Sequence, residues 1–129
     1  MTFRRTGRAG EQGSAALELV VLMPLLLLIL LAGIQGAVYF HARTLAIAAA
    51  QEGVRAAATP QATIATGQRA AETFLTHTAG DSLSGITITG TRTATTATIT
   101  VRGVSLSLIP GWTPRVEQTA TLPVERITR

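Results

Sequence analysis

Residue types that carry out chemistry are few in this chain, and they are not grouped. His41 and His77 lie far apart, and neither has an Asp, Glu or Cys at the spacing of a metal site. The hydroxyls of Ser105 and Ser107 have no base beside them in the sequence, and no glycine-rich phosphate loop precedes a helix. The absence of Cys excludes disulfides and thiol chemistry. We therefore expect no enzyme activity, no cofactor, no metal and no small-molecule substrate.

The charge distribution bears on whether the protein binds nucleic acid. The net charge is +4 and every basic residue is Arg, but no basic stripe carries interleaved aromatic side chains. Such a stripe is the usual footprint of a nucleic-acid-binding surface. We expect no nucleic-acid partner.

Glu18 is an acidic residue at the start of an apolar stretch, where a carboxylate is unusual. From Leu19 to Phe40 there is no charged residue, and Gln35 is the only strongly polar side chain. A helix of roughly 20 such residues crosses the hydrocarbon core of a bilayer, whereas a helix of a soluble domain is apolar along one stripe only. The sequence predicts a transmembrane helix over residues 14–40. Glu18 then lies either at the headgroup boundary or beside a partner charge, since an ionised carboxylate deep in lipid costs about 2.5–3.5 kcal/mol.

The segment before this helix sets its predicted orientation. Residues 1–13 carry Arg4, Arg5 and Arg8 against the single acid Glu11, and they read as a basic, unstructured leader. The positive-inside rule places this leader in the cytoplasm and the C-terminal part of the chain across the membrane. The competing interpretation is a secretory signal cut near residues 46–50, but the apolar run is too long for that class of signal.

Small residues and a proline mark the predicted span as a packing surface. Pro24 removes one helical hydrogen-bond donor, which membrane helices tolerate. Ala32 and Gly36 are four residues apart, as are Gly33 and Ala37. This spacing lets another helix come close to the backbone. The alternative is that Gly and Ala are simply common in membrane helices.

Residues 41–58 continue as a helical extension, because they are rich in Ala and contain no Pro. Glu52 and Arg55 are three residues apart and can pair. Gly53 weakens the helix, which indicates close packing against another segment. We expect one side to be formed by Leu45, Ala48, Ala49, Glu52 and Ala56.

Residues 59–129 are expected to form a small extracytoplasmic domain. Thr59 suits a helix N-cap and Pro60 the first helical position, so a second, amphipathic helix is predicted to begin there and to end at Gly80. Phe74 is expected to bridge this helix and the sheet that follows.

The remainder of the chain alternates between apolar and polar residues with a period of two, which is typical of half-buried strands. The first strand contains Ile86 and Ile88, the second runs to Gly103, and the last covers residues 116–124. After Gly103 the apolar residues shift by one position, which predicts a bulge there. Three consecutive antiparallel strands covered by helix on one face make an α+β domain.

In the N-terminal half, a basic leader is followed by Gly13, four small or apolar residues, Glu18, and an apolar helix that contains Pro24. This arrangement resembles the prepilin-peptidase site of type IV pilins and pseudopilins. The chain resembles TadE-like proteins, the minor pilins or pseudopilins of tight-adherence (Tad/Flp) pilus systems, from Gly13 to Ala58. The resemblance is carried by Ser14-Ala15-Ala16-Leu17-Glu18, Met23-Pro24-Leu25 and Ala49–Ala57.

This resemblance implies a structural subunit of a bacterial pilus or secretion assembly, held in the cytoplasmic membrane. It implies that a prepilin peptidase cuts between Gly13 and Ser14, and that the new Ser14 ammonium pairs with Glu18 of a neighbouring subunit. Leu19 stands where filament-forming Flp pilins have Tyr, which favours a minor pilin over a major one. The implied partners are the peptidase and other pilus subunits. The alternative is an uncleaved, membrane-anchored or secreted binding module with no pilus role.

Overall fold

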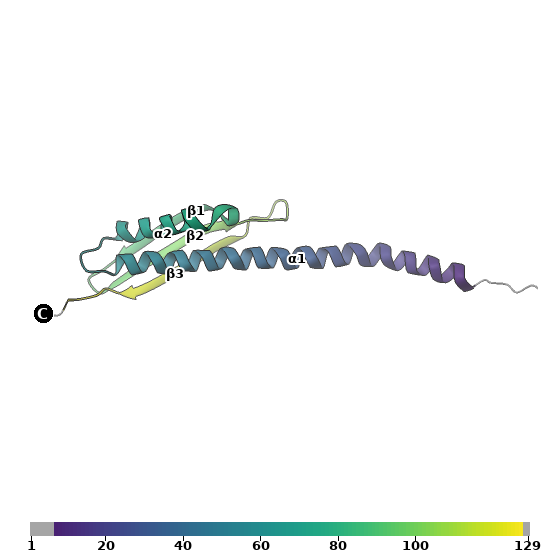
Figure 1. Ribbon diagram of the computed structural model, residues 1–129, viewed down its shortest axis with the longest axis horizontal. Coiled ribbons are helices and arrows are strands. Elements are labelled where there is room, and N and C mark those ends of the chain that lie inside the picture. The colour runs from purple at the N-terminus through teal and green to yellow at the C-terminus, as the bar shows by residue number, and fades with distance from the viewer. Residues whose placement is uncertain (1–6, 128–129) are drawn as a thin grey trace, which may run out of the picture. The chain divides into compact units, whose positions relative to one another are not determined.

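The computed structural model describes residues 7–127, with side chains from residue 12 onward. The described chain contains two α-helices, one short 3-10 turn and three strands (Figure 1). The elements are α1 (Gly7–Ala57), α2 (Ile64–Thr78), η1 (Gly80–Ser82), β1 (Leu83–Arg92), β2 (Thr96–Ser105) and β3 (Arg115–Pro123). This order confirms the predicted α+β class, with a long apolar helix, a second helix and a three-stranded antiparallel sheet. The chain divides into two compact units, one ending at Ile34 and the other beginning at Gln35.

Helix α1 begins earlier than the sequence suggested. Residues 7–13 are helical, although the leader was expected to be unstructured. This stretch has no Pro, and Ala9, Glu11 and Gln12 are good helix formers, so the helix extends backward from the apolar run. The helix also continues through Pro24. Arg4 and Arg5 lie outside the described residues, as does the side chain of Arg8.

The C-terminal end of α1 is closed by residues from distant parts of the chain. The Arg92 Nε donates a hydrogen bond to the Ala57 carbonyl oxygen at 2.9 Å, and the Glu125 backbone N–H donates to the Ala58 carbonyl oxygen at 3.0 Å. The Thr59 hydroxyl donates to the Ala56 carbonyl oxygen at 2.9 Å. The last carbonyl groups of a helix have no partner inside it. These three donors therefore supply the missing bonds.

Helix α2 begins four residues later than predicted. Its N-cap is Thr63, whose hydroxyl oxygen accepts a bond from the Thr66 backbone N–H at 3.4 Å. Thr59 was the expected cap, but its hydroxyl is used at the end of α1 instead. At the other end the prediction is confirmed: the helix stops before Gly80, whose positive φ of 52° suits the residue after a C-cap.

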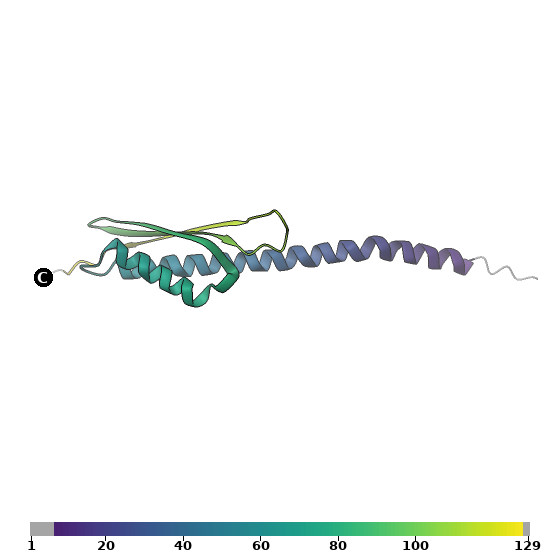
Figure 2. The ribbon, with the colours of Figure 1, turned by 90° about the horizontal axis from the view of Figure 1, so that it is seen from above.

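The three strands pair in the order β1-β2-β3, and Figure 2 shows both helices on the same side of the sheet. Ile88 pairs with Val101, and Ile99 pairs with Ala120. Ile99 and Val101 are completely buried. The alternating pattern in the sequence therefore gives one covered face, as predicted.

The bulge lies on β1 rather than at Gly103. The register between β1 and β2 shifts between Ser84 and Thr87, and Gly85 has a positive φ of 58°. The predicted shift of phase in β2 is wrong, because Gly103 and Ser105 stay buried on the inner face. Leu83 packs so tightly over Gly103 that a Cβ there would lie 2.9 Å from the leucine side chain. Close packing explains this glycine, and the extra residue belongs to the partner strand.

The core of the second unit is built on an alanine-rich face of α1. The buried apolar residues of this face are Ala42, Ala46, Ala49, Ala50, Val54 and Ala57, and Ala58, directly after the helix, is buried as well. The expected face was rotated by about one position, since Glu52 is exposed and pairs with Arg55 at 3.8 Å. Leu75 of α2 is buried, whereas Phe74 is only half-buried against the core. The predicted bridging position is therefore taken mainly by Leu75.

Candidate membrane-spanning and assembly surface

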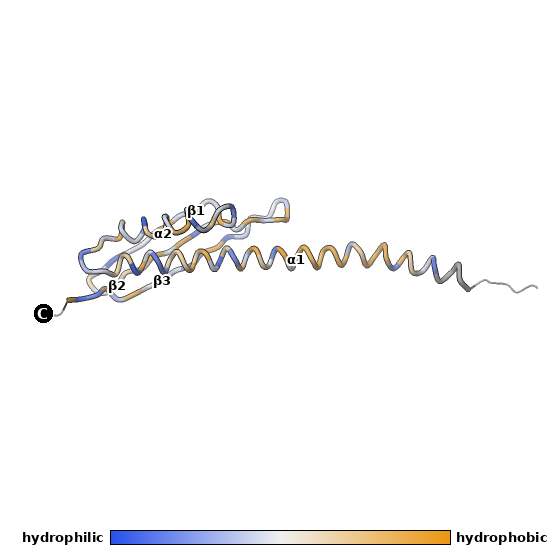
Figure 3. The backbone as a smooth tube through the Cα atoms, in the orientation of Figure 1, coloured by the Kyte–Doolittle hydropathy of each residue, from blue (hydrophilic) through white to orange (hydrophobic). Residues whose placement is uncertain are grey.

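The apolar part of α1 is uncovered. Every residue from Leu17 to Ile34 is exposed, and Figure 3 shows this part of the helix as its most hydrophobic section. Among residues 7–127, α1 is the one helix long and apolar enough to cross a membrane. Its length and composition fit a single-pass membrane anchor near the N-terminus.

The predicted processing and assembly residues all lie in α1 and are all exposed. Ser14 and Glu18 are four residues apart, so they share one helix face with Leu17, Val21 and Leu22. The Gly13–Ser14 bond is inside the helix. A protease that cuts there must first unwind it locally, and a glycine lowers that cost by up to about 1 kcal/mol relative to Ala.

The glycines of α1 fall into two groups. A Cβ added at Gly13, Gly33 or Gly36 would meet no atom within 4 Å. A Cβ added at Gly53 would lie 2.8 Å from the backbone carbonyl oxygen of Gly67 in α2. The fold of this chain therefore explains Gly53 and does not explain the other three, each of which costs the helix up to about 1 kcal/mol.

The other predicted packing residues are placed as follows. Pro24, Ala32 and Ala37 are exposed on α1. Pro24 lacks an N–H, so the Val20 carbonyl does not receive the usual helical bond. The chain itself leaves all three positions open to lipid or to another helix, and their role in packing stays a prediction.

Gln35 is a residue whose role the sequence did not reveal. Its side chain is 3% exposed. Its Nε2 donates to the Leu106 carbonyl oxygen at 3.2 Å, and its Oε1 accepts from the Leu108 backbone N–H at 2.7 Å. The available signal was its position as the only strongly polar side chain between Leu19 and Phe40. Such a residue in an apolar helix needs a partner.

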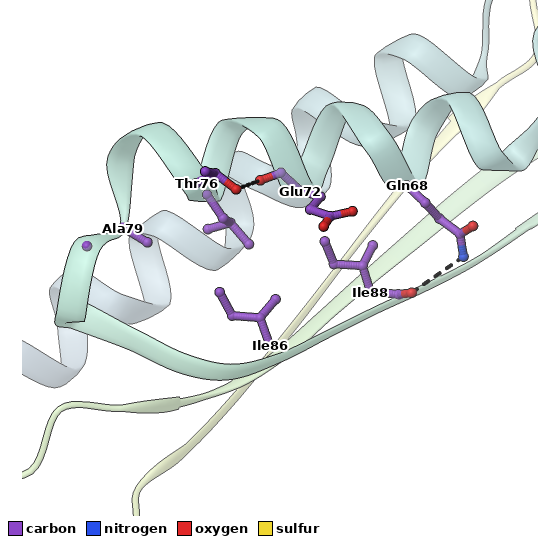
Figure 4. Close-up of a pocket in the computed structure, with 8 residues that line it drawn as sticks. Gln68, Glu72, Thr76, Ala79, Ile86 and Ile88 are labelled. Atoms are coloured by element: carbon purple, nitrogen blue, oxygen red, sulfur yellow. Dashed lines mark hydrogen bonds between the residues drawn. The ribbon is translucent and has the colours of Figure 1, made fainter.

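An open groove lies between α2 and β1 (Figure 4). The Gln68 Nε2 donates to the Ile88 carbonyl oxygen at 3.4 Å across this groove, and Ile86 lines its floor. Of the described residues that line it, Glu72 is the only ionisable one. Within residues 7–127 no three His, Cys, Asp or Glu side chains gather as a metal site would require. The groove offers apolar contact and one carboxylate.

The comparison with known families concerns the same helix. Residues 13–55 match the family model described as TadE-like protein. This N-terminal segment is therefore similar to TadE-like proteins. The TadE-like segment makes up about a third of the chain, contains Gly13, Ser14 and Glu18, and confirms the resemblance predicted from the sequence. It points to a component associated with a Tad pilus system and its membrane. No curated protein and no solved structure matches the chain.

Proposed function

We propose that this protein is a minor pilin or pseudopilin-like structural component of a bacterial Tad/Flp pilus or secretion assembly. The observation that supports it most is that the TadE-like segment includes a long helical surface, from Leu17 to Ile34, in which every residue is exposed. In this proposal the protein is not an enzyme. Its partners are the membrane, a prepilin peptidase and other pilus subunits.

The helix serves two environments in turn. Before assembly, lipid surrounds the apolar part of α1, residues 17–34, with the N-terminus in the cytoplasm and the sheet on the opposite side of the membrane. During assembly, apolar helices of neighbouring subunits replace the lipid. Gly33 and Gly36, which have no neighbours within 4 Å, let a second helix approach the backbone closely.

Processing by the peptidase connects these two states. A cut after Gly13 removes the basic leader and creates an ammonium group on Ser14. Glu18 is exposed on the same helix face, so its carboxylate is available to the Ser14 ammonium of an adjacent subunit. Two opposite charges that enter an apolar helical bundle as a pair avoid the cost of burying either alone, which is about 3–5 kcal/mol when one partner is removed.

Two substitutions separate cleavage from assembly. Gly13→Leu replaces the small residue before the cut, and we expect full-length protein that stays in the membrane with its leader attached. Glu18→Ala leaves the scissile bond unchanged, so we expect normal cleavage but no incorporation into a complex. Mass spectrometry of the N-terminus and co-purification of other pilus components measure the two effects.

Glu52→Ala is the matched control, because Glu52 is an exposed acid on the same helix beyond the apolar stretch. It should leave both cleavage and incorporation unchanged. A wild-type chain that keeps residues 1–13 while pili are being made would disprove processing. An anchored assembly factor associated with the pilus would then be the remaining form of the proposal.

A further inference from the structure

The connection between β2 and β3, residues 106–114 (the β2–β3 loop), exposes large apolar side chains. Leu106, Leu108, Ile109 and Trp112 are 45%, 41%, 39% and 47% exposed. No charged residue occurs from Gly103 to Pro114. A contiguous uncharged segment with four exposed apolar side chains is typical of a surface that contacts a protein or a membrane.

Hydrogen bonds give this loop a defined shape. The Trp112 backbone N–H donates to the Ile109 carbonyl oxygen at 3.3 Å around Pro110 and Gly111, and Gly111 has a φ of 79°. Pro followed by a glycine of positive φ is the pattern of a type II turn. At its base, the Ser105 N–H donates to the Pro114 carbonyl oxygen at 2.9 Å. The apolar side chains are thus presented by an ordered turn.

The Gln35 side chain of α1 binds the loop through hydrogen bonds. Its side-chain amide binds the backbone of Leu106 and Leu108, with one bond donated and one accepted. Gln35 follows Ile34 directly, and α1 continues between them without a break. From Leu17 to Ile34 the helix rises about 27 Å, close to the thickness of the hydrocarbon core. The loop is therefore tied to α1 at the residue where a span of this length ends.

We propose that the β2–β3 loop inserts into the headgroup layer of the membrane that α1 spans, with Trp112 as its anchor. Trp is enriched at this depth because its ring is apolar and its indole N–H is polar. Arg115, which is exposed directly after the loop, is placed to meet lipid phosphates. This inference rests on the membrane-spanning part of the proposed function and goes beyond it. In this proposal the protein contacts the membrane at two places, the span of α1 and the β2–β3 loop.

The amide of Gln35 has a role that an apolar residue cannot take. Backbone N–H and C=O groups without a partner are unfavourable where the loop approaches the hydrocarbon core, because no water is available there to bind them. Gln35 pairs one carbonyl and one N–H of the loop, so the loop backbone can approach the apolar layer. Gln35 is thus a positioning residue for the loop.

The only Trp of the chain, Trp112, reports on this contact directly. The full-length protein is reconstituted at low density into vesicles whose phospholipids carry bromine either near the headgroup end or near the tail end of the acyl chain. We expect shallow bromine to remove most of the Trp112 emission and deep bromine to remove less. Stronger quenching by deep bromine overturns the interfacial position. Quenching by aqueous iodide alone overturns lipid contact altogether.

Substitutions test whether the Gln35 side chain positions the β2–β3 loop. Gln35→Leu should reduce quenching by shallow bromine and shift the emission to longer wavelength, while Gln51→Leu, at an exposed position of the same helix, should change neither. If Gln35→Leu fails to fold, the double variant Leu108→Ser and Ile109→Ser keeps the test open, because both side chains are exposed. It should weaken quenching in the same way, and unchanged quenching overturns the proposal.

Two further outcomes separate the alternatives. The first is a loss of bromine quenching, with a shift of the Trp112 emission, as the protein density in the vesicles rises. This result would mean that a second copy of the chain covers the loop, and it would overturn lipid as the partner of the loop. Resistance of the protein to alkaline extraction from the vesicles shows whether α1 spans the bilayer. A chain that is extracted contradicts the proposed function as well, whereas a retained chain without lipid quenching contradicts only this inference.

Discussion

Gly53 of α1 and Gly67 of α2 touch backbone to backbone. A Cβ on Gly53 would lie 2.8 Å from the Gly67 carbonyl oxygen, and a Cβ on Gly67 would lie 2.6 Å from the Gly53 carbonyl oxygen. Both glycines also lie against the side chain of Ile99 in β2. The backbones of the two helices therefore approach each other beside Ile99 of the central strand, and neither glycine position tolerates even a methyl group without movement.

Gly53→Ala should lower the free energy of unfolding of the second unit by about 1–2 kcal/mol, because overpacking against a fixed backbone oxygen outweighs the gain in helix propensity. Urea unfolding of the full chain in detergent, followed by Trp112 fluorescence, measures the change. Gly36→Ala is the control, since a Cβ there meets no atom within 4 Å. It should leave the midpoint unchanged or raise it.

Arg92→Ala should cost about 1–3 kcal/mol, because the Ala57 and Thr59 carbonyl oxygens each lose a charged donor. Arg102→Ala is the comparison. Arg102 pairs with Glu117 at 3.0 Å, but its side chain is 58% exposed, and such pairs contribute about 0–1 kcal/mol. Equal shifts of the urea midpoint in the two variants would show that the Arg92 hydrogen bonds at the end of α1 stabilise the fold no more than the exposed Arg102–Glu117 pair does.

Leu75→Ala should cost about 2–5 kcal/mol, because the leucine is 3% exposed and its removal leaves a cavity. Phe74→Ala should cost less than the roughly 3–5 kcal/mol expected for a fully buried Phe, because Phe74 is half-buried. Thermal unfolding by circular dichroism compares the two. A larger loss of stability in Phe74→Ala would mean that Phe74 is the main contact between helix and sheet, as the sequence predicted.

Gly33→Leu should leave the unfolding midpoint of the isolated protein unchanged, because a Cβ at this position would meet no atom of the described residues within 4 Å. In cells that assemble pili, it should reduce co-purification with other pilus components, since a large side chain keeps a second helix at a distance. Leu30→Ile, an apolar exchange at an exposed position, is the matched control. Normal incorporation of Gly33→Leu would exclude close helix packing at this site.

The elements that the sequence predicted correctly are those with a strong local period. The apolar run of α1 and the alternating strands are recognisable from neighbouring residues alone. The start of α2 was placed wrongly because Thr59 and Thr63 are both suitable caps. The choice depends on the end of α1, where the Thr59 hydroxyl binds Ala56. The bulge was likewise placed on the wrong strand, because Gly103 is explained by contact with Leu83 and not by a change of phase.

The candidate site shows the same division. The roles of Gly13, Ser14 and Glu18 are implied by the resemblance to pilins and TadE-like proteins and stay predictions, and the three residues lie on an exposed part of α1. The contact between Gln35 and the β2–β3 loop joins residues 71 and 73 positions apart. No local pattern in the sequence gives such a pairing.

The closure of α1 by Arg92 and Glu125 sets an order of events during synthesis. Helix α1 ends at Ala57, but the donors to the Ala57 and Ala58 carbonyl oxygens lie 35 and 67 positions later in the chain, at Arg92 and Glu125. Until the segment around Glu125 has emerged, the helix end has no partner for the Ala58 carbonyl other than water. Any chain truncated before Glu125 should therefore have a frayed junction between the long helix and the sheet. Glu125, two residues beyond β3, thus joins the end of α1 to the segment that follows the sheet.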